Sequence, residues 1–540
     1  MLRITGRLQR GGLIGMTAFG IFYGLIQASA YKSAAGTTTA QQAAFGHQME
    51  VLGQSLIYLL PKPIGLENIS GFLQWRVYGV LPLLFGIWVV ISGAGASRGD
   101  EDRGLVDEWV SAGVSPIRYL VARVTGFVAA AAIAVAATSA AIDAGAISAG
   151  TSLDLVAVTE VSVALLAVVI ASYAVVVVIG QLTSSRGATV GVSSGVLLVM
   201  FFVNSLGRSI DSLHQLAQFV SPFYYYDRSN PLTPGGSFDA GGTGGLFVFA
   251  AVLFGAAAWF MRRRDLGSSL IHRRSHEAPL AQQPAHNPLL RVPVLSALYE
   301  QRIGLLAWIA GTSLGAAYMA SLGRQIVDFS KSAPAFKAYL TLAGHGDPYV
   351  ALTGFFWFGI FQLLLAAYAI AQVAGWASDD NEGRLEMVLS APVSRTRVVL
   401  ERAATLVIGT SLVVGFSSLA FYYGAHASNI NVQAGDLLQA SFAAIPFGAS
   451  FAAVGALLAS RVPRQTVIVL ATVVFASYII TQLGPLLKWP DWVMRLSLLS
   501  LYGNPLANGI DWTGLWILIA VCVAGFGLGA VLLQRRDVGA

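Results

Sequence analysis

Hydrophobic residues along this chain collect in long runs, and polar residues collect in the short segments between them. A helix needs about 20 consecutive apolar residues to cross a bilayer. Runs of that length predict about twelve spans, at approximately 11–30, 76–97, 121–147, 155–181, 187–205, 244–261, 303–322, 351–374, 398–424, 434–460, 465–485 and 512–534. The expected fold class is therefore an all-α integral membrane protein.

Composition supports the same conclusion. Hydrophobic residues make up 55% of the 540 positions and charged residues 11%, against about 25% charged in a soluble domain. The net charge of +6 does not indicate nucleic acid, because the basic residues lie in short loops beside the apolar runs. The expected environment is a lipid bilayer, with no nucleic-acid partner.

The distribution of arginine predicts the orientation in the membrane. If both termini are cytoplasmic, most of the Lys and Arg residues fall on the cytoplasmic side, as the positive-inside rule requires. A composition rich in Ala, Gly and Val, with more Arg than Lys, favours a bacterial plasma (inner) membrane. The first run could pass for a signal peptide, but the equivalent run at 303–322 favours a retained span.

The loops that follow the second and the eighth run are similar in sequence, which indicates an internal repeat. With a constant offset, Asp100, Gly104, Ser111, Ser115, Arg118 and Arg123 fall on Asp379, Gly383, Ser390, Ser394, Arg397 and Arg402, and Asp107 falls on Glu386. The endings Arg263-Arg264-Asp265 and Arg535-Arg536-Asp537 also match. We therefore expect a first six-helix half at 1–267, a cytoplasmic linker at 268–290 and a second half at 291–540. Six spans each make the halves parallel repeats, with a pathway between them.

The loop after the eighth run predicts a short amphipathic helix on the cytoplasmic side. Leu385, Val388 and Leu389 share one face, and the loop after the second run has the same register. A helix lying on lipid headgroups remains an alternative, but such helices are usually basic on their polar face. Acidic residues here, among them Asp100, Glu101, Asp379 and Asp380, favour a basic groove on a partner protein.

Two adjoining segments, Glu382-Gly383-Arg384-Leu385-Glu386 and Leu389-Ser390-Ala391-Pro392-Val393-Ser394-Arg395, carry a family resemblance. The chain resembles the permeases of type-two ABC exporters, in particular those with two halves in one chain that are associated with export of polyketide antibiotics and drugs. In that family this loop docks on the nucleotide-binding subunit. The resemblance implies two coupling elements, at 100–118 and 379–397, with the following contact residues: Gly104, Asp107, Glu108, Ser111, Ser115, Arg118, Glu382, Gly383, Glu386, Ser390, Pro392, Ser394 and Arg397. The first copy departs from the family pattern at Arg103, Trp109 and Gly113.

The chain contains no Gly-Lys dipeptide and hence no phosphate-binding loop. We therefore expect no catalytic residue, no metal and no cofactor in this chain. ATP and Mg²⁺ would be bound by a separate ABC ATPase subunit, in two copies. The alternative is a carrier driven by an ion gradient, which would need ionisable groups near the middle of the membrane. Asp143 and Glu160 are expected nearer the outer surface, although the segment from Arg98 to Gly104 resembles the Asp-Arg-x-Gly loop of major-facilitator carriers.

The substrate pathway is expected to be mostly apolar and to suit an amphipathic compound, whether an antibiotic, a drug or a lipid. Candidate lining residues are the aromatics of the first, second, seventh and eighth spans: Phe19, Phe22, Tyr23, Trp88, Trp308, Phe355, Phe358 and Phe361. Helix packing or lipid contact is the alternative for each aromatic taken singly, since aromatic rings supply large apolar surfaces anywhere in a bilayer.

Overall fold

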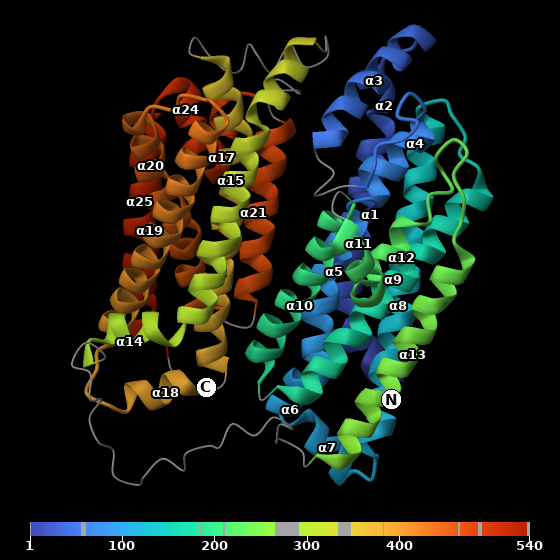
Figure 1. Ribbon diagram of the computed structural model, residues 1–540. Coiled ribbons are helices and arrows are strands. Elements are labelled where there is room, and N and C mark those ends of the chain that lie inside the picture. The colour runs from blue at the N-terminus through green and yellow to red at the C-terminus, as the bar shows by residue number, and fades with distance from the viewer. Residues whose placement is uncertain are drawn as a thin grey trace. The chain divides into compact units, whose positions relative to one another are not determined.

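The computed structural model describes residues 2–55, 61–183, 185–208, 211–264, 291–332, 347–381, 383–462, 465–483 and 489–536 (Figure 1). Every regular element in these ranges is a helix. The chain divides into two compact units, Met1–Pro279 and Leu280–Ala540. The division falls in the expected linker, which lies outside the described residues, so the expected domain boundaries stay a prediction.

The first unit is built around six long helical segments. These are α1 (Leu2–Ser29), α5 (Leu81–Ala94), α8 (Pro116–Ser148), α9 (Leu155–Leu182), α10 (Arg186–Gly207) and α13 (Ala240–Arg263). Shorter elements join them: α2 (Tyr31–Ala35), α3 (Thr39–Ser55), α4 (Ile69–Leu73), η1 (Gln74–Tyr78), η2 (Gly95–Gly99), α6 (Asp100–Asp102), α7 (Leu105–Ser111), α11 (Asp211–Val220) and α12 (Pro222–Asp227). The elements from α4 to α6 form one helical path, Ile69–Asp102, that passes through the two π-helical turns η1 and η2.

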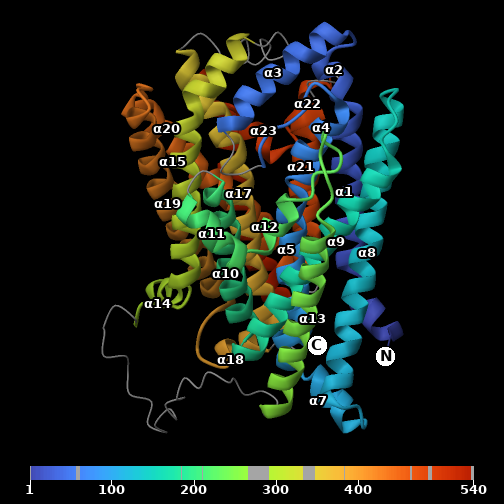
Figure 2. The ribbon, with the colours of Figure 1, turned by 45° about the vertical axis from the view of Figure 1, so that its right-hand side comes forward.

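The second unit follows the same plan. Its long helices are α15 (Arg302–Ser332), α17 (Pro348–Asn381), α19 (Arg395–Ala427), α20 (Ala434–Ala459), α21 (Thr466–Leu483) and α25 (Trp512–Arg535). Its short helices are α14 (Pro293–Glu300), α18 (Arg384–Leu389), α22 (Asp491–Met494), α23 (Leu498–Tyr502) and α24 (Pro505–Asn508). Figure 2 shows both units from a second direction.

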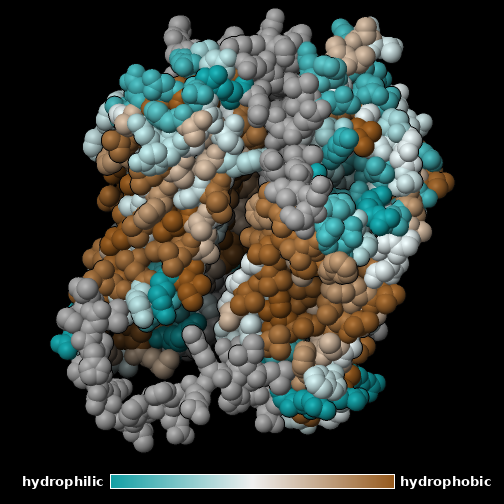
Figure 3. All heavy atoms as spheres, viewed as in Figure 1, coloured by the Kyte–Doolittle hydropathy of each residue, from teal (hydrophilic) through white to brown (hydrophobic). Residues whose placement is uncertain are grey.

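Eleven helices within the described residues are long and apolar enough to cross a membrane. Helices satisfy their own backbone hydrogen bonds, which a bilayer interior requires. On the face seen in Figure 3, hydrophobic residues cover the middle of each unit and hydrophilic residues lie toward its ends. The all-α integral membrane class is thus confirmed. The expected eleventh span corresponds to α21, whose apolar stretch Thr466–Tyr478 is shorter than the others, so the twelve-span layout stays a prediction.

The two units use the same helix pairs. In the first, α1 packs along α8, α5 along α9, and α9 along α13; in the second, α15 packs along α19, α17 along α20, and α20 along α25. Gly145 of α8 and Gly424 of α19 occupy equivalent positions at the first of these crossings. A Cβ on Gly145 would meet Ala28 Cβ at 2.7 Å, and one on Gly424 would meet Ala317 Cα at 3.1 Å. Small residues let membrane helices approach closely, so both crossings depend on glycine.

Matched hydrogen bonds extend this correspondence into the spans. The Ser162 hydroxyl of α9 donates to Ser139 of α8 at 2.7 Å, and the Ser441 hydroxyl of α20 donates to Ser418 of α19 at 2.7 Å. Both pairs have the sequence offset that relates Asp100 to Asp379. The structural repeat therefore reaches well beyond the loops in which the sequence shows it.

Candidate functional site

Each unit gathers buried or half-buried arginines at one end of its helices. In the first unit this end carries α6, α7 and the close of α13, and in the second it carries α18 and the close of α25 (Figure 1). Three segments meet there in each unit. They are the C-terminal end of the unit's second span, the N-terminal end of its third span and the C-terminal end of its last span. We call it the arginine end of the unit.

In the first unit the arginine end is organised around Asp100, whose side chain is fully buried. Its Oδ2 atom lies 2.8 Å from Arg123 Nε and accepts a hydrogen bond of 2.6 Å from the Tyr119 hydroxyl. Arg103 donates to Oδ1 at 2.6 Å. A buried carboxylate is tolerated only when it is paired and hydrogen-bonded, and Asp100 has both kinds of partner.

The neighbouring Glu101 is held by two further arginines. Arg98 Nη1 lies 2.9 Å from Glu101 Oε2, and Arg264 Nη1 donates to the same oxygen at 2.8 Å. Arg98 also donates to the Gly180 carbonyl at 3.0 Å, and Arg264 donates to Gln181 Oε1 at 3.0 Å. We call the set Arg98, Asp100, Glu101, Arg123 and Arg264 the first clamp. It joins η2, α6 and α8 to the residue that follows α13, and it is closed to solvent.

The second unit repeats this arrangement at equivalent positions. Arg402 Nη2 donates to Asp379 Oδ2 at 3.3 Å, and Arg536 Nη1 donates to Asp380 Oδ2 at 2.6 Å. We call Asp379, Asp380, Arg402 and Arg536 the second clamp. It joins α17 and α19 to the residue that ends α25. In each unit the clamp thus connects the loop after the second or eighth run with the Arg-Arg-Asp ending, the two parts of the chain in which the sequence shows the repeat.

The second clamp is more open than the first. Ala377 stands where the first clamp has Arg98, and Val398 stands where it has Tyr119. The Asp379 side chain is 39% exposed, whereas that of Asp100 is 0% exposed. A cavity of about 30 Å³ lies beside the second clamp, and its lining includes Asp380, Arg402 and Ala459.

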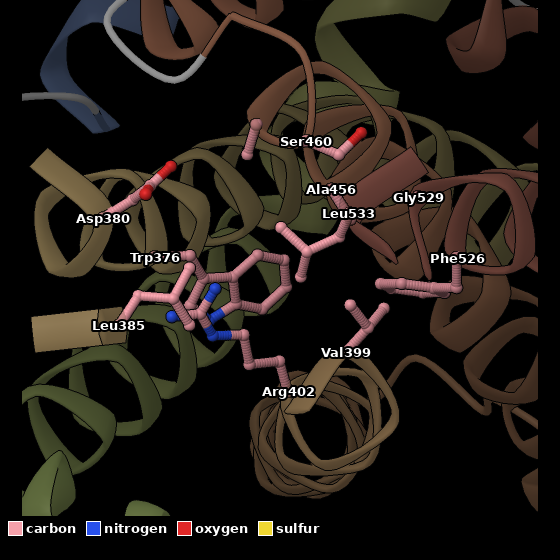
Figure 4. Close-up of a pocket in the computed structure, with 11 residues that line it drawn as sticks. Trp376, Asp380, Leu385, Val399, Arg402, Ala456, Ser460, Phe526, Gly529 and Leu533 are labelled. Atoms are coloured by element: carbon pink, nitrogen blue, oxygen red, sulfur yellow. The ribbon is translucent and has the colours of Figure 1, made fainter. Parts of the chain in front are cut away.

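Figure 4 shows the surroundings of this cavity. Arg402 extends from α19 toward Trp376, with Leu385 of α18 beside them. The Arg402 guanidinium carbon lies 5.9 Å from the centre of the Trp376 ring. Asp380 and Ala459 are equivalent to Glu101 and Gly180, the two residues that bind Arg98 in the first clamp. In the second clamp Arg536 binds both of these groups, since its Nη1 atom donates to Asp380 Oδ2 at 2.6 Å and to the Ala459 carbonyl at 3.3 Å.

These clamps correct one expectation of the sequence analysis. Asp100, Glu101 and Asp380 do not face a partner protein, because arginines of their own unit enclose them. The helix of the second span continues to Asp102, so the carboxylates lie at the end of a span and not in the loop. The matched arginines Arg264 and Arg536 were the sequence signal that could have identified these pairs.

Glycine and serine residues of the segments 100–118 and 379–397 shape the two short helices. Gly104 has φ 71° and Gly383 has φ 72°, and each precedes a short helix, α7 or α18. Ser115 and Ser394 cap the next spans, accepting bonds of 3.3 Å from the backbone N–H groups of Arg118 and Arg397. The hydroxyls of Ser111 and Ser390 bond back to Glu108 and Met387 carbonyls. Glu382 lies outside the described residues.

One side chain anchors each short helix and the polar face points outward. Val106 and Leu385, at equivalent positions, are 1% and 3% exposed. The exposed residues of the two elements include Asp107, Glu108, Glu386, Met387, Val388, Pro392, Arg118 and Arg397. The expected apolar face was therefore partly wrong, because Val388 turns outward while Leu385 and Leu389 pack inward. The outer surface of α18 combines a carboxylate with apolar side chains.

The aromatic pathway candidates divide equally between the units. Trp88, Phe358 and Phe361 are buried in the cores of their own units, where Trp88 contacts Phe127 and Phe361 stacks on Trp357. Phe19, Phe22, Tyr23, Trp308 and Phe355 are half-buried or exposed. Four of these residues belong to each unit, and their role in a pathway stays a prediction.

Alanine at Gly383 is expected to destabilise the second unit, because an L residue with positive φ costs about 1–2 kcal/mol. No side chain lies close enough to oppose a Cβ there, so the effect comes from the backbone alone. We expect Gly383→Ala to lower the unfolding temperature of purified protein by a few degrees, and Gly383→Asn to lower it less. Gly187→Ala is the control, since Gly187 is helical and also has open space. Equal effects at both positions would contradict this assignment.

Residues 290–534 match a family model described as the multidrug efflux system permease Rv1217c, C-terminal domain. The matched range includes α18 together with Asp379, Asp380 and Arg402. A comparison with curated proteins finds no match. The family match and the membrane-spanning helices support a permease of the multidrug efflux kind.

Proposed function

We propose that this chain is the membrane permease of an ATP-driven exporter of the type-two ABC class. It moves amphipathic or hydrophobic compounds, such as an antibiotic, a drug or a lipid, out of the cell. Two copies of a separate ABC ATPase subunit bind ATP and Mg²⁺ and supply the work. The observation that carries the proposal is the pair of equivalent short helices at the arginine ends of the units: α7 presents Asp107 and Glu108 outward, and α18 presents Glu386.

An apolar contact and an ion pair connect α18 to the spans of the second unit. Leu385 anchors α18 against Val399 of α19 and Leu533 of α25, and Arg384 Nε lies 3.2 Å from Asp379 Oδ1. A load applied to α18 would thus reach α17, α19 and α25 together. This connection suits an element that transmits movement from a docked ATPase.

The arginine end of each unit is proposed to be cytoplasmic, with both chain termini on that side of a bacterial plasma (inner) membrane. Arginine at the ends of spans is retained on the cytoplasmic side during insertion. The same side holds ATP, so this orientation and the docking role of the short helices are mutually consistent.

An ion-gradient carrier is the second candidate, and Asp143 of α8 is the observation that favours it. The Asp143 Oδ1 atom is buried and has no hydrogen-bond partner in the described part of the chain. Unpaired carboxylates within membrane spans often carry protons. On the exporter account, Asp143→Asn leaves ATP-dependent transport unchanged; on the carrier account, it abolishes transport.

The direct test is affinity purification of the tagged chain from gently solubilised native membranes. The exporter account expects recovery of an ATPase with a phosphate-binding loop, in stoichiometric amount, and reduced recovery with Glu386→Ala. Asp436→Ala is the matched control, because Asp436 is an exposed acid in the first turn of α20. Recovery of the chain alone, without ATPase activity, would refute the proposal.

A further inference from the structure

A groove of about 750 Å³ opens at the arginine end of the second unit. Residues of α14, α15, α17, α18 and α19 line it. Its volume falls within the range of about 300–1,000 Å³ that is typical of sites for drug-sized molecules. The groove lies beside the second clamp, since Asp379 and Arg402 form part of its wall.

Two indole rings line this groove. Trp308 of α15 is half-buried and meets Tyr368 edge-on, with ring centres 5.7 Å apart. Trp376 of α17 already has the Arg402 guanidinium 5.9 Å from its ring centre. Tryptophan is the best aromatic partner for a cation. The groove therefore offers surfaces that bind flat apolar groups and positive charge.

One carboxylate in the groove favours a positively charged occupant. Glu300, Asp379 and Glu401 line the groove, against Arg384 and Arg402. Both arginines are engaged by Asp379. Glu401 accepts from Arg397 at 2.7 Å. Glu300 is exposed and forms no ion pair within the described residues, so its carboxylate remains available to a ligand.

We propose that this groove binds an amphipathic aromatic cation. The Glu300 carboxylate attracts the charge, and the indoles of Trp308 and Trp376 contact the apolar rings. The proposal rests on the proposed function, because it assigns a substrate class to the exporter. Arg384, Leu385 and Val388 of α18 also line the groove, so an occupant touches the helix assigned to ATPase docking.

The site belongs to the second unit. Ser97 occupies the position equivalent to Trp376, so the first unit lacks this indole. Arg98 fills the next position in the first clamp and is 1% exposed. We therefore assign ligand binding to the second unit alone, although both units carry a short docking helix.

The test is equilibrium binding of radiolabelled tetraphenylphosphonium to the purified full chain in nanodiscs of uncharged lipid. Empty nanodiscs give the background from partition into lipid. We expect saturable binding, weakened at least threefold by Trp308→Ala, in line with the strength of cation–π contacts. Glu300→Gln, which removes a negative charge from the groove, should also weaken it at least threefold. Trp516→Ala and Asp436→Asn are the matched controls, because both residues are exposed and lie outside the groove.

Tetraphenylborate, an anion of the same shape, tests the role of charge. Weaker protein-dependent binding of the anion supports the proposal. Equal binding of the two ions, unchanged affinity in both groove variants, or no saturable binding of the cation would overturn it. The assay contains no ATPase, so a failed purification of the partner would refute the proposed function and leave the groove result intact.

Discussion

Replacing Asp100 by alanine is expected to destabilise the protein by about 3–5 kcal/mol, because breaking a buried ion pair leaves an uncompensated charge. Arg123, itself nearly buried, would lose its carboxylate, and Tyr119 would lose its acceptor. Asp379→Ala is the matched variant in the second unit. Since Asp379 is 39% exposed, we expect its loss to cost about 1 kcal/mol or less.

The measurement is thermal unfolding of both variants, purified in detergent and monitored by tryptophan fluorescence. The fraction of each variant that is recovered as a monodisperse peak in size-exclusion chromatography is the second readout. Asp100→Leu combined with Arg123→Leu should recover part of the stability, since removing both partners leaves no buried charge unpaired. Equal destabilisation by Asp100→Ala and Asp379→Ala would contradict the difference between the clamps.

Reversing the charge of Glu386 is expected to reduce export at least about tenfold, which corresponds to about 1.4 kcal/mol of docking free energy. Glu386 is exposed on α18, and its side chain forms no hydrogen bond or ion pair with the described residues. A basic groove on the ATPase would repel the new arginine of Glu386→Arg, and like charges at an interface are costly. Stability and membrane insertion should remain those of the wild type.

The readouts are drug accumulation in cells, the amount of chain in the membrane, and ATPase activity in the purified complex. Asp107→Arg changes the equivalent position of the first unit and shows whether both short helices dock. Asp436→Arg places the same change in the first turn of α20 and should leave export unaltered. Normal export by Glu386→Arg would remove α18 from the coupling role.

The membrane class could be predicted from sequence because an apolar run as long as a bilayer is thick is typical of a membrane-spanning helix. The repeat was also readable, since Asp100, Gly104 and Ser115 align with Asp379, Gly383 and Ser394 at one offset. The positive φ of both glycines and the caps formed by both serines explain why these residue types recur.

The clamps could not be predicted because they depend on where a helix ends. Sequence placed the end of the second span near residue 97, whereas the helix continues through the π-helical turn η2 to Asp102. This extension of five residues places Asp100 and Glu101 inside the helix of the span, whereas the sequence analysis placed them in the loop. The orientation of Val388 was missed for a related reason, because Gly383 sets the start of α18 and Leu385 then takes the buried position.

The most direct test of ATP-driven export is transport into inside-out membrane vesicles that contain this chain and its co-purified ATPase. A panel of cationic, neutral and anionic amphipathic compounds would be supplied with ATP, with a non-hydrolysable analogue, or with ATP and a protonophore. The account predicts that at least one compound accumulates only with hydrolysable ATP and still accumulates in the presence of the protonophore. Accumulation that proceeds without ATP and collapses with the protonophore would contradict it and establish an ion-driven carrier.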